Sequence, residues 1–122
     1  MTKGAAIYQF FNRFMPFYPA TSVPDDVIFP YGTYELATSA FLDGEVSMTV
    51  NLWFYTESEA IPNAMVQEIS DAIGQGGVTL RCDGGRIWIK RGSPFSQSLR
   101  DDTAPGIKRR YLNVTAEYFT QN

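Results

Sequence analysis

The side chains that most often carry catalysis or bind metals are scarce in this sequence. It contains no histidine and a single cysteine, Cys82. Without histidine there can be no Ser–His or Cys–His nucleophile system and no metal site that needs an imidazole. One cysteine cannot form a thiolate zinc cluster within one chain, and no Gly-Lys-Ser/Thr phosphate-binding loop is present. We therefore expect a protein that is not an enzyme and that has no cofactor.

Two pairs of adjacent acids, Asp25-Asp26 and Asp101-Asp102, are the remaining candidates for carboxylate chemistry. Such a pair can in principle bind a cation or act as an acid and a base. Adjacent acids between structured elements are far more often turn formers and solubilising charge. We expect no catalytic residue and no metal site here. Cys82 falls in a predicted strand, where a free cysteine usually packs as a small hydrophobic residue.

Charge is divided unevenly along the chain, which has a net charge of −3. From Phe14 to Leu80 there are nine acids and no lysine or arginine, whereas from Arg81 onward there are eight basic residues and four acids. The simplest explanation is that these charged side chains lie on the solvated surface and serve only solubility. The alternative is a subunit with an acidic patch and a basic patch that pair between copies placed head to tail.

The densest basic cluster is Lys108-Arg109-Arg110, at the beginning of the last predicted strand. Charges of this kind can prevent wrong strand pairing at a sheet edge. They can also contact an acidic neighbour or make a passive contact with DNA phosphates. Three basic residues on a chain of negative net charge do not indicate a dedicated nucleic-acid-binding protein.

Hydrophobic periodicity predicts two helices. In the first, Ile7, Phe10, Phe11 and Phe14 form one apolar stripe, and Pro16 ends the helix. The second is predicted over Ser58–Ile73, with Ser58 as its N-cap and Gly74 as its stop. Its expected buried stripe consists of Ile61, Met65, Ile69, Ala72 and Ile73.

Alternating residues predict the strands. The clearest run is 46–55, which pairs with 31–38 through a turn at Asp43-Gly44 to form an antiparallel hairpin. If Trp53 and Tyr55 face away from the core, they form an aromatic patch that is either an interface or covered by a helix. Strands are also predicted at 78–83 and 86–91, joined by Gly84-Gly85, and at 107–119.

Together these elements predict an α+β fold in which two helices pack on one face of a mainly antiparallel sheet of about five strands. We expect one domain spanning residues 1–122, with a long loop at about 92–106. There is no run of about 18 apolar residues, so we expect no membrane partner. We expect the chain to be made in the cytoplasm and to stay there at least until assembly.

Several segments in this order also carry a resemblance to a known family. The sequence resembles the tail-terminator, tail-completion and minor capsid, or head–tail joining, proteins of long-tailed bacteriophages and their prophages. The resemblance covers about Ile7 to Phe119. It rests on the order of the elements and on four segments, Phe17-Tyr18-Pro19, Val23-Pro24-Asp25-Asp26, Phe29-Pro30-Tyr31 and Leu52-Trp53-Phe54-Tyr55-Thr56.

The resemblance implies a structural virion protein that assembles as a hexameric ring, terminates the tail tube and joins it to the head connector. Its partners would be further copies of itself, the tail-tube protein and the head-connector protein. Its location would be the head–tail junction of the virion, after a period in the host bacterial cytoplasm. We predict an interface with Phe95 and Leu99 as apolar anchors and with polar contacts from Arg100, Asp101, Asp102, Lys108, Arg109 and Arg110.

Two alternatives remain open at this point. One is a different phage component, such as a head-closure or tail-tube protein, which would be recognised by polymerisation into tubes instead of rings. The other is a small cytoplasmic ligand-binding module that holds an apolar ligand between its helices and its sheet. A stable monomer with a closed apolar pocket would favour that reading.

Overall fold

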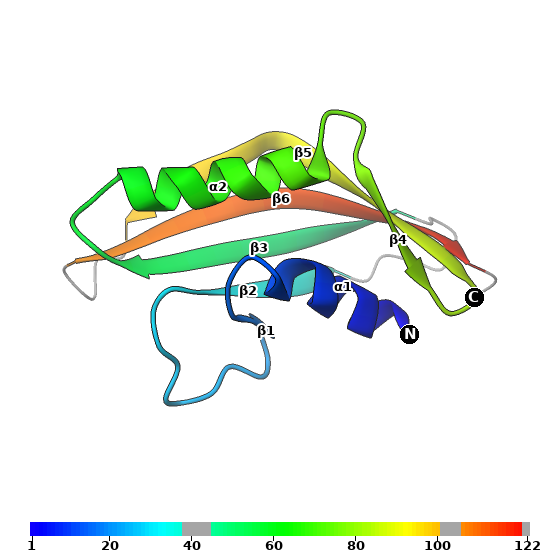
Figure 1. The fold of residues 1–122 in the computed structure, drawn as a ribbon, viewed down its shortest axis with the longest axis horizontal. Coiled ribbons are helices and arrows are strands. Elements are labelled where there is room, and N and C mark those ends of the chain that lie inside the picture. Colours follow the sequence, from blue (N-terminus) through cyan, green and yellow to red (C-terminus); the bar gives the residue numbers. More distant parts are fainter. Residues whose placement is uncertain (38–44, 101–105, 121–122) are drawn as a thin grey trace.

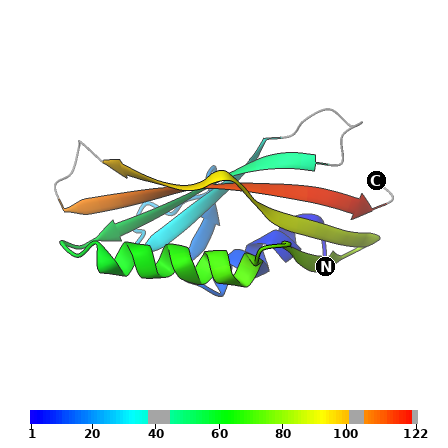
Figure 2. The ribbon, with the colours of Figure 1, turned by 90° about the horizontal axis from the view of Figure 1, so that it is seen from above.

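The computed structural model describes residues 1–37, 45–100 and 106–120. Within these ranges, two helices lie on the same face of one sheet, and the opposite face carries no helix (Figures 1 and 2). The predicted α+β class is therefore confirmed. In chain order the elements are α1 (Lys3–Asn12), β1 (Phe17–Pro19), β2 (Tyr31–Ala37), β3 (Glu45–Tyr55), α2 (Ala60–Ile73), β4 (Val78–Cys82), β5 (Gly85–Arg100) and β6 (Ile107–Thr120).

The sheet has six strands in the order β1-β2-β3-β6-β5-β4. It is mixed, because β1 runs parallel to β2 while every other neighbouring pair is antiparallel. We expected about five mainly antiparallel strands. The sheet instead has one additional strand, and that strand forms a parallel pair. The additional strand comes from Phe17–Pro19, three residues in a segment that holds four prolines between positions 16 and 30. A strand this short has too few residues to show alternation.

The predicted loop at 92–106 is wrong for residues 92–100, which continue β5. The pairing of β5 with β6 shifts between Arg91 and Ser96, and regular pairing then resumes at Ser96 opposite Leu112. The irregularity falls over Gly92, Ser93, Pro94 and Phe95, and glycine and proline are typical of positions where strand pairing is interrupted. The Asn113 side-chain amide donates to the Pro94 carbonyl oxygen at 2.6 Å and holds the displaced backbone against β6.

The core lies between the helices and the inward face of the sheet. Alternation along β3 buries Met48, Val50, Leu52 and Phe54. The stripe predicted for α1 is confirmed, since Ile7, Phe10 and Phe11 are buried and Phe14 packs against the core. Helix α1 begins where the Thr2 hydroxyl oxygen accepts a hydrogen bond from the Ala5 amide at 3.1 Å.

Helix α2 agrees with the sequence prediction at its C-terminal end and differs at its start. Ile69 and Ile73 are buried, and Gly74 ends the helix with a positive φ of 77°. Ile61, however, is exposed, and Pro62 is buried in its place. A row of residues at a strict spacing of four drifts around a helix of 3.6 residues per turn, so Ile61 points about 120° away from Ile73. The helix begins at Ala60, whose amide donates to the Ser58 hydroxyl oxygen at 3.1 Å.

The hairpin between β4 and β5 has its turn one residue earlier than predicted. Cys82 pairs with Gly85, so the two turn residues are Asp83 and Gly84 rather than Gly84 and Gly85. Gly84 has a φ of +80°, a conformation that other residues adopt only with strain. The predicted turn at Asp43-Gly44 lies outside the described residues, although the antiparallel pairing of β2 with β3 is confirmed.

Candidate functional site

The helix-free face of the sheet carries an ordered group of aromatic side chains. Alternation along β3 turns Trp53 away from the core, and the Tyr31 ring stacks on it with centroids 5.1 Å apart at 15°. The Arg109 guanidinium lies 5.7 Å from the centroid of the Trp53 ring, and its Nε donates to the Asn51 side-chain oxygen at 2.9 Å. These contacts hold Trp53 half-buried on a face that no helix covers.

An apolar groove lies beside this aromatic group, where β3 ends and α2 begins. Its volume is about 430 Å³, and its lining residues are Ile28, Phe29, Pro30, Phe54, Tyr55, Thr56 and Ile61. Three of them are unusually exposed for large apolar side chains: Ile28 at 80%, Tyr55 at 70% and Ile61 at 54%. Clusters of exposed apolar side chains mark binding surfaces more often than scattered ones do. We define these seven residues as the apolar groove.

Sequence reasoning found only part of this groove. Tyr55 was expected, if it faced away from the core, to belong to an aromatic patch that is either an interface or covered by a helix. Ile28 lies in a proline-rich connection without periodicity, and Ile61 was assigned to the buried stripe of α2. No signal in the sequence brings these two residues together, because their proximity depends on how the connection before β2 packs against the beginning of α2.

Two residues of the predicted basic cluster form an ion-pair network within the chain. Arg110 is 4% exposed, and its Nη2 donates to the Glu59 carboxylate at 2.6 Å and to the Asn63 side-chain oxygen at 3.2 Å. The Lys108 ammonium lies 2.8 Å from the other carboxylate oxygen of Glu59. The acidic and basic halves of the sequence therefore meet within one copy of the protein, at the first turn of α2.

The predicted interface residues whose side chains the structure describes do not lie on one surface. Lys108 and Arg110 point toward α2, whereas Arg109, between them on β6, points to the helix-free face. Phe95 packs partly buried against the core. Leu99 and Arg100 belong to the end of β5, opposite Arg109 and Lys108. Asp101 and Asp102 lie outside the described residues. Whether any of these residues contacts a partner stays a prediction.

The Glu59 network gives folding a pH dependence that can be measured. Hydrogen bonds from Lys108 and then Arg110 lower the pKa of Glu59 below its ordinary value of 4.5. The carboxylate therefore stabilises the fold above pH 4.5, and this contribution is lost as the pH falls through the lowered pKa. We expect Glu59→Gln to be less stable than the wild type at neutral pH, with a difference that shrinks toward pH 3. Urea unfolding of both proteins at several pH values measures the difference, and a constant difference would contradict the assignment.

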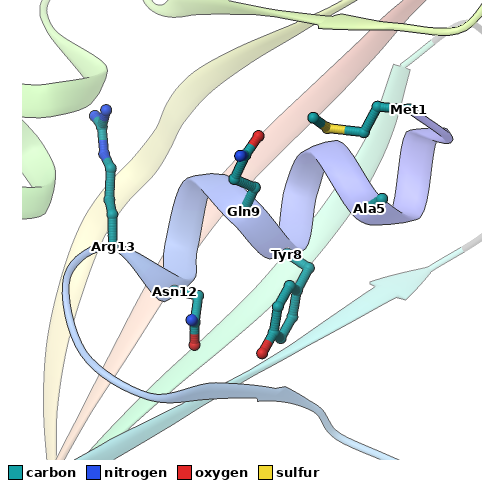
Figure 3. A pocket seen from close by; sticks show the side chains of 6 residues that line it. All are labelled: Met1, Ala5, Tyr8, Gln9, Asn12 and Arg13. Carbon is teal, nitrogen blue, oxygen red and sulfur yellow. The ribbon is translucent and has the colours of Figure 1, made fainter.

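The outer side of α1 carries a second exposed surface, drawn in Figure 3. A shallow hollow of about 470 Å³ is lined by Met1, Ala5, Tyr8, Gln9, Asn12 and Arg13. An adjoining hollow of about 530 Å³ shares Met1, Gln9 and Arg13 and extends over Thr79, Leu80 and Arg81 of β4. Met1 is 53% exposed and Tyr8 is 43% exposed. We define the residues of the first hollow, together with Arg81, as the α1 patch.

Metal-ligating side chains are not clustered in the described part of the chain. Within residues 1–37, 45–100 and 106–120, no three histidine, cysteine, aspartate or glutamate side chains are grouped so that they could hold a metal ion. Cys82 is half-buried and packs against the core, as expected from its position on a strand. No helix in these ranges is sufficiently long and apolar to span a bilayer.

Comparison with known proteins identifies the fold. No protein-family model matches the chain, and no curated protein matches it. Among solved structures, it is similar to a chain in the virion of a native gene transfer agent particle, with a TM-score of 0.67 and 17% sequence identity. The match covers 95% of this chain and 93% of the other. The chain therefore shares its fold, over nearly its whole length, with a protein found in a virion.

Proposed function

We propose that this chain is a structural subunit of a tailed, phage-like particle, and that it acts through contacts between subunits and not through catalysis. The observation that carries the proposal is the fold match with a virion chain, which extends over 95% of this protein. The exposed apolar groove supports it, because a large apolar surface open to water is unfavourable unless a partner covers it.

The role that fits best is a ring at the end of the tail, between the tail tube and the head connector. This finer assignment is supported by the resemblance of the four aromatic and proline-containing segments to tail-terminator and head–tail joining proteins. In such a role, the ring would be a closed set of identical contacts, six in number by that resemblance, with one face toward the tube and the other toward the connector. The work of the protein would then be the alignment of two larger assemblies.

Labelling of intact particles tests the position. A gold-labelled antibody against this chain, applied to purified tailed particles from the same source, is expected to mark one point at the head–tail junction in electron micrographs. Labelling along the whole tail would instead support the alternative of a tail-tube protein. Absence of the chain from purified particles, measured by mass spectrometry, would contradict a structural role in the virion.

A further inference from the structure

We propose that copies of this chain associate head to tail, with the apolar groove of one copy receiving the α1 patch of the next. The inference deepens the proposed function, since it names the surfaces that would close the ring. It concerns the contact between two copies only, so it can be tested apart from the position of the protein in a particle.

The distribution of exposed apolar side chains is the first argument. Within the described residues, the large apolar side chains that are strongly exposed are Met1, Tyr8, Ile28, Tyr55, Ile61 and Phe119. Three of them lie at the apolar groove and two at the α1 patch, so that five of the six belong to two surfaces. Two hydrophobic surfaces of this kind would each lose contact with water if they covered one another.

Charge complementarity is the second argument, and it identifies the occupant. Asp25 and Asp26 are exposed in the connection that carries Ile28, and exposed Glu57 follows the groove residue Thr56. The basic residues at this end, Lys108 and Arg110, are already bound by Glu59. The α1 patch instead carries exposed Arg13 and Arg81, and none of its lining residues is acidic. The exposed Asp83 carboxylate beside it is paired with the Met1 ammonium. An acidic rim facing a basic patch favours this pairing and disfavours groove against groove.

Arg13 is held in place before any partner arrives. Its guanidinium lies 4.8 Å from the centroid of the Phe10 ring and 5.1 Å from that of Phe14. In Figure 3 its side chain extends away from the helix, on the same side as Gln9 and Met1. A cation that is already positioned loses less conformational entropy when it meets a carboxylate, so it contributes more to association than a freely moving one.

The positions of the two surfaces determine what kind of assembly results. The groove lies at the end of the molecule where β3 ends and α2 begins, whereas the N-terminus, beside the α1 patch, lies toward the other end (Figure 1). Because the two surfaces are different, one contact leaves a free groove on one copy and a free patch on the other. Such heterologous contacts form a closed ring where the rotation between copies permits closure, and otherwise they extend into an open filament.

A mixing experiment distinguishes this groove-to-patch contact from a contact between two grooves and from no association. Ile28→Asp removes the groove contact and Tyr8→Asp removes the patch contact, while each variant keeps the other surface. Sedimentation velocity is expected to show species larger than dimers for the wild type and monomers for each variant alone. An equimolar mixture is expected to form a dimer with one copy of each, because only one intact groove and one intact patch remain per pair. Phe119→Asp introduces the same charge at the exposed apolar residue that belongs to neither surface. This variant should assemble like the wild type.

Other outcomes would overturn the proposal. A wild-type protein that stays monomeric up to millimolar concentration, or a mixture that contains no mixed dimer, excludes this contact. Assembly of Tyr8→Asp alone into dimers would show that the groove binds another groove. Circular dichroism of each variant verifies that the fold is intact. If the copies join through these surfaces into open filaments, the contact is supported while the ring in the proposed function fails.

Charge reversal provides a second test that leaves the apolar residues unchanged. Arg13→Asp alone, and Asp25→Arg with Asp26→Arg, are each expected to weaken association by about 5- to 50-fold. A mixture of the Arg13→Asp protein with the doubly reversed protein should recover association between unlike copies. Glu68→Lys, an exposed reversal on α2, is the control for net charge. Equal weakening by Glu68→Lys, or no recovery in the mixture, would contradict the pairing.

Discussion

Replacing Phe11 with alanine is expected to lower the free energy of unfolding by about 3–5 kcal/mol, the range for truncating a large buried aromatic side chain. Phe11 is fully buried and joins three elements. Its ring lies 5.1 Å from that of Phe10 on α1, 5.1 Å from that of Phe17 on β1 and 6.0 Å from that of Tyr34 on β2. Truncation would leave a cavity that these rings cannot fill without moving the helix.

The control for this change is Phe119→Ala, on a residue that is 51% exposed. Folding buries much less apolar surface of Phe119 than of Phe11. Truncation of Phe119 should therefore lower the free energy of unfolding far less. Urea denaturation followed by circular dichroism gives both free energies of unfolding. Similar losses for the two variants would mean that α1 does not pack on the sheet as described here.

Gly77→Ala is expected to destabilise the fold by about 1–3 kcal/mol more than Gly84→Ala, which is the usual cost of forcing extra volume into a packed site. Both glycines have a positive φ, 87° at Gly77 and 80° at Gly84, so both substitutions carry a similar backbone strain. They differ in the space available. A Cβ at Gly77 would collide with the Trp88 indole nitrogen and lie 2.7 Å from the Ile89 carbonyl oxygen, whereas nothing lies within 4 Å of a Cβ at Gly84.

The collision at Gly77 has a second consequence that can be observed directly. The Trp88 indole donates a hydrogen bond to the Gly76 carbonyl oxygen at 2.9 Å, and a methyl group at position 77 would displace the ring. Thermal unfolding of the two alanine variants measures the difference in stability, and tryptophan fluorescence reports the displacement of the indole. Equal melting temperatures with unchanged fluorescence would contradict the close approach of Gly77 to Trp88.

Local patterns in the sequence predicted most of the secondary structure. The apolar stripe at Ile7, Phe10 and Phe11 and the alternation along 46–55 each reflect a helix or strand with one buried side. The stripe was confirmed, and so was the alternation from Met48 to Tyr55. The stop at Gly74 was also confirmed, because a positive φ is a local property of the backbone. Errors occurred where tertiary contacts decide, as in β1 and the second half of β5, which are strands because β2 and β6 pair with them.

The candidate site was predicted much less completely than the fold. Lys108-Arg109-Arg110 was recognised as a cluster, but strand alternation divides it between two faces, and Glu59 binds two of its members. The apolar groove combines residues from the connection before β2, the end of β3 and the start of α2. Contacts between segments so distant in sequence depend on the packed fold. Their prediction would require the topology, which no single segment specifies.

The central position of β6 determines when this protein can fold during synthesis. β6 pairs with both β3 and β5, yet it follows both of them in the chain. Until residues 107–120 have left the ribosome, the strands on either side of it have unpaired edges that can join to other nascent chains. Completion of the sheet is therefore a late, long-range event. A truncation or a translational pause shortly before β6 would expose these edges and promote aggregation.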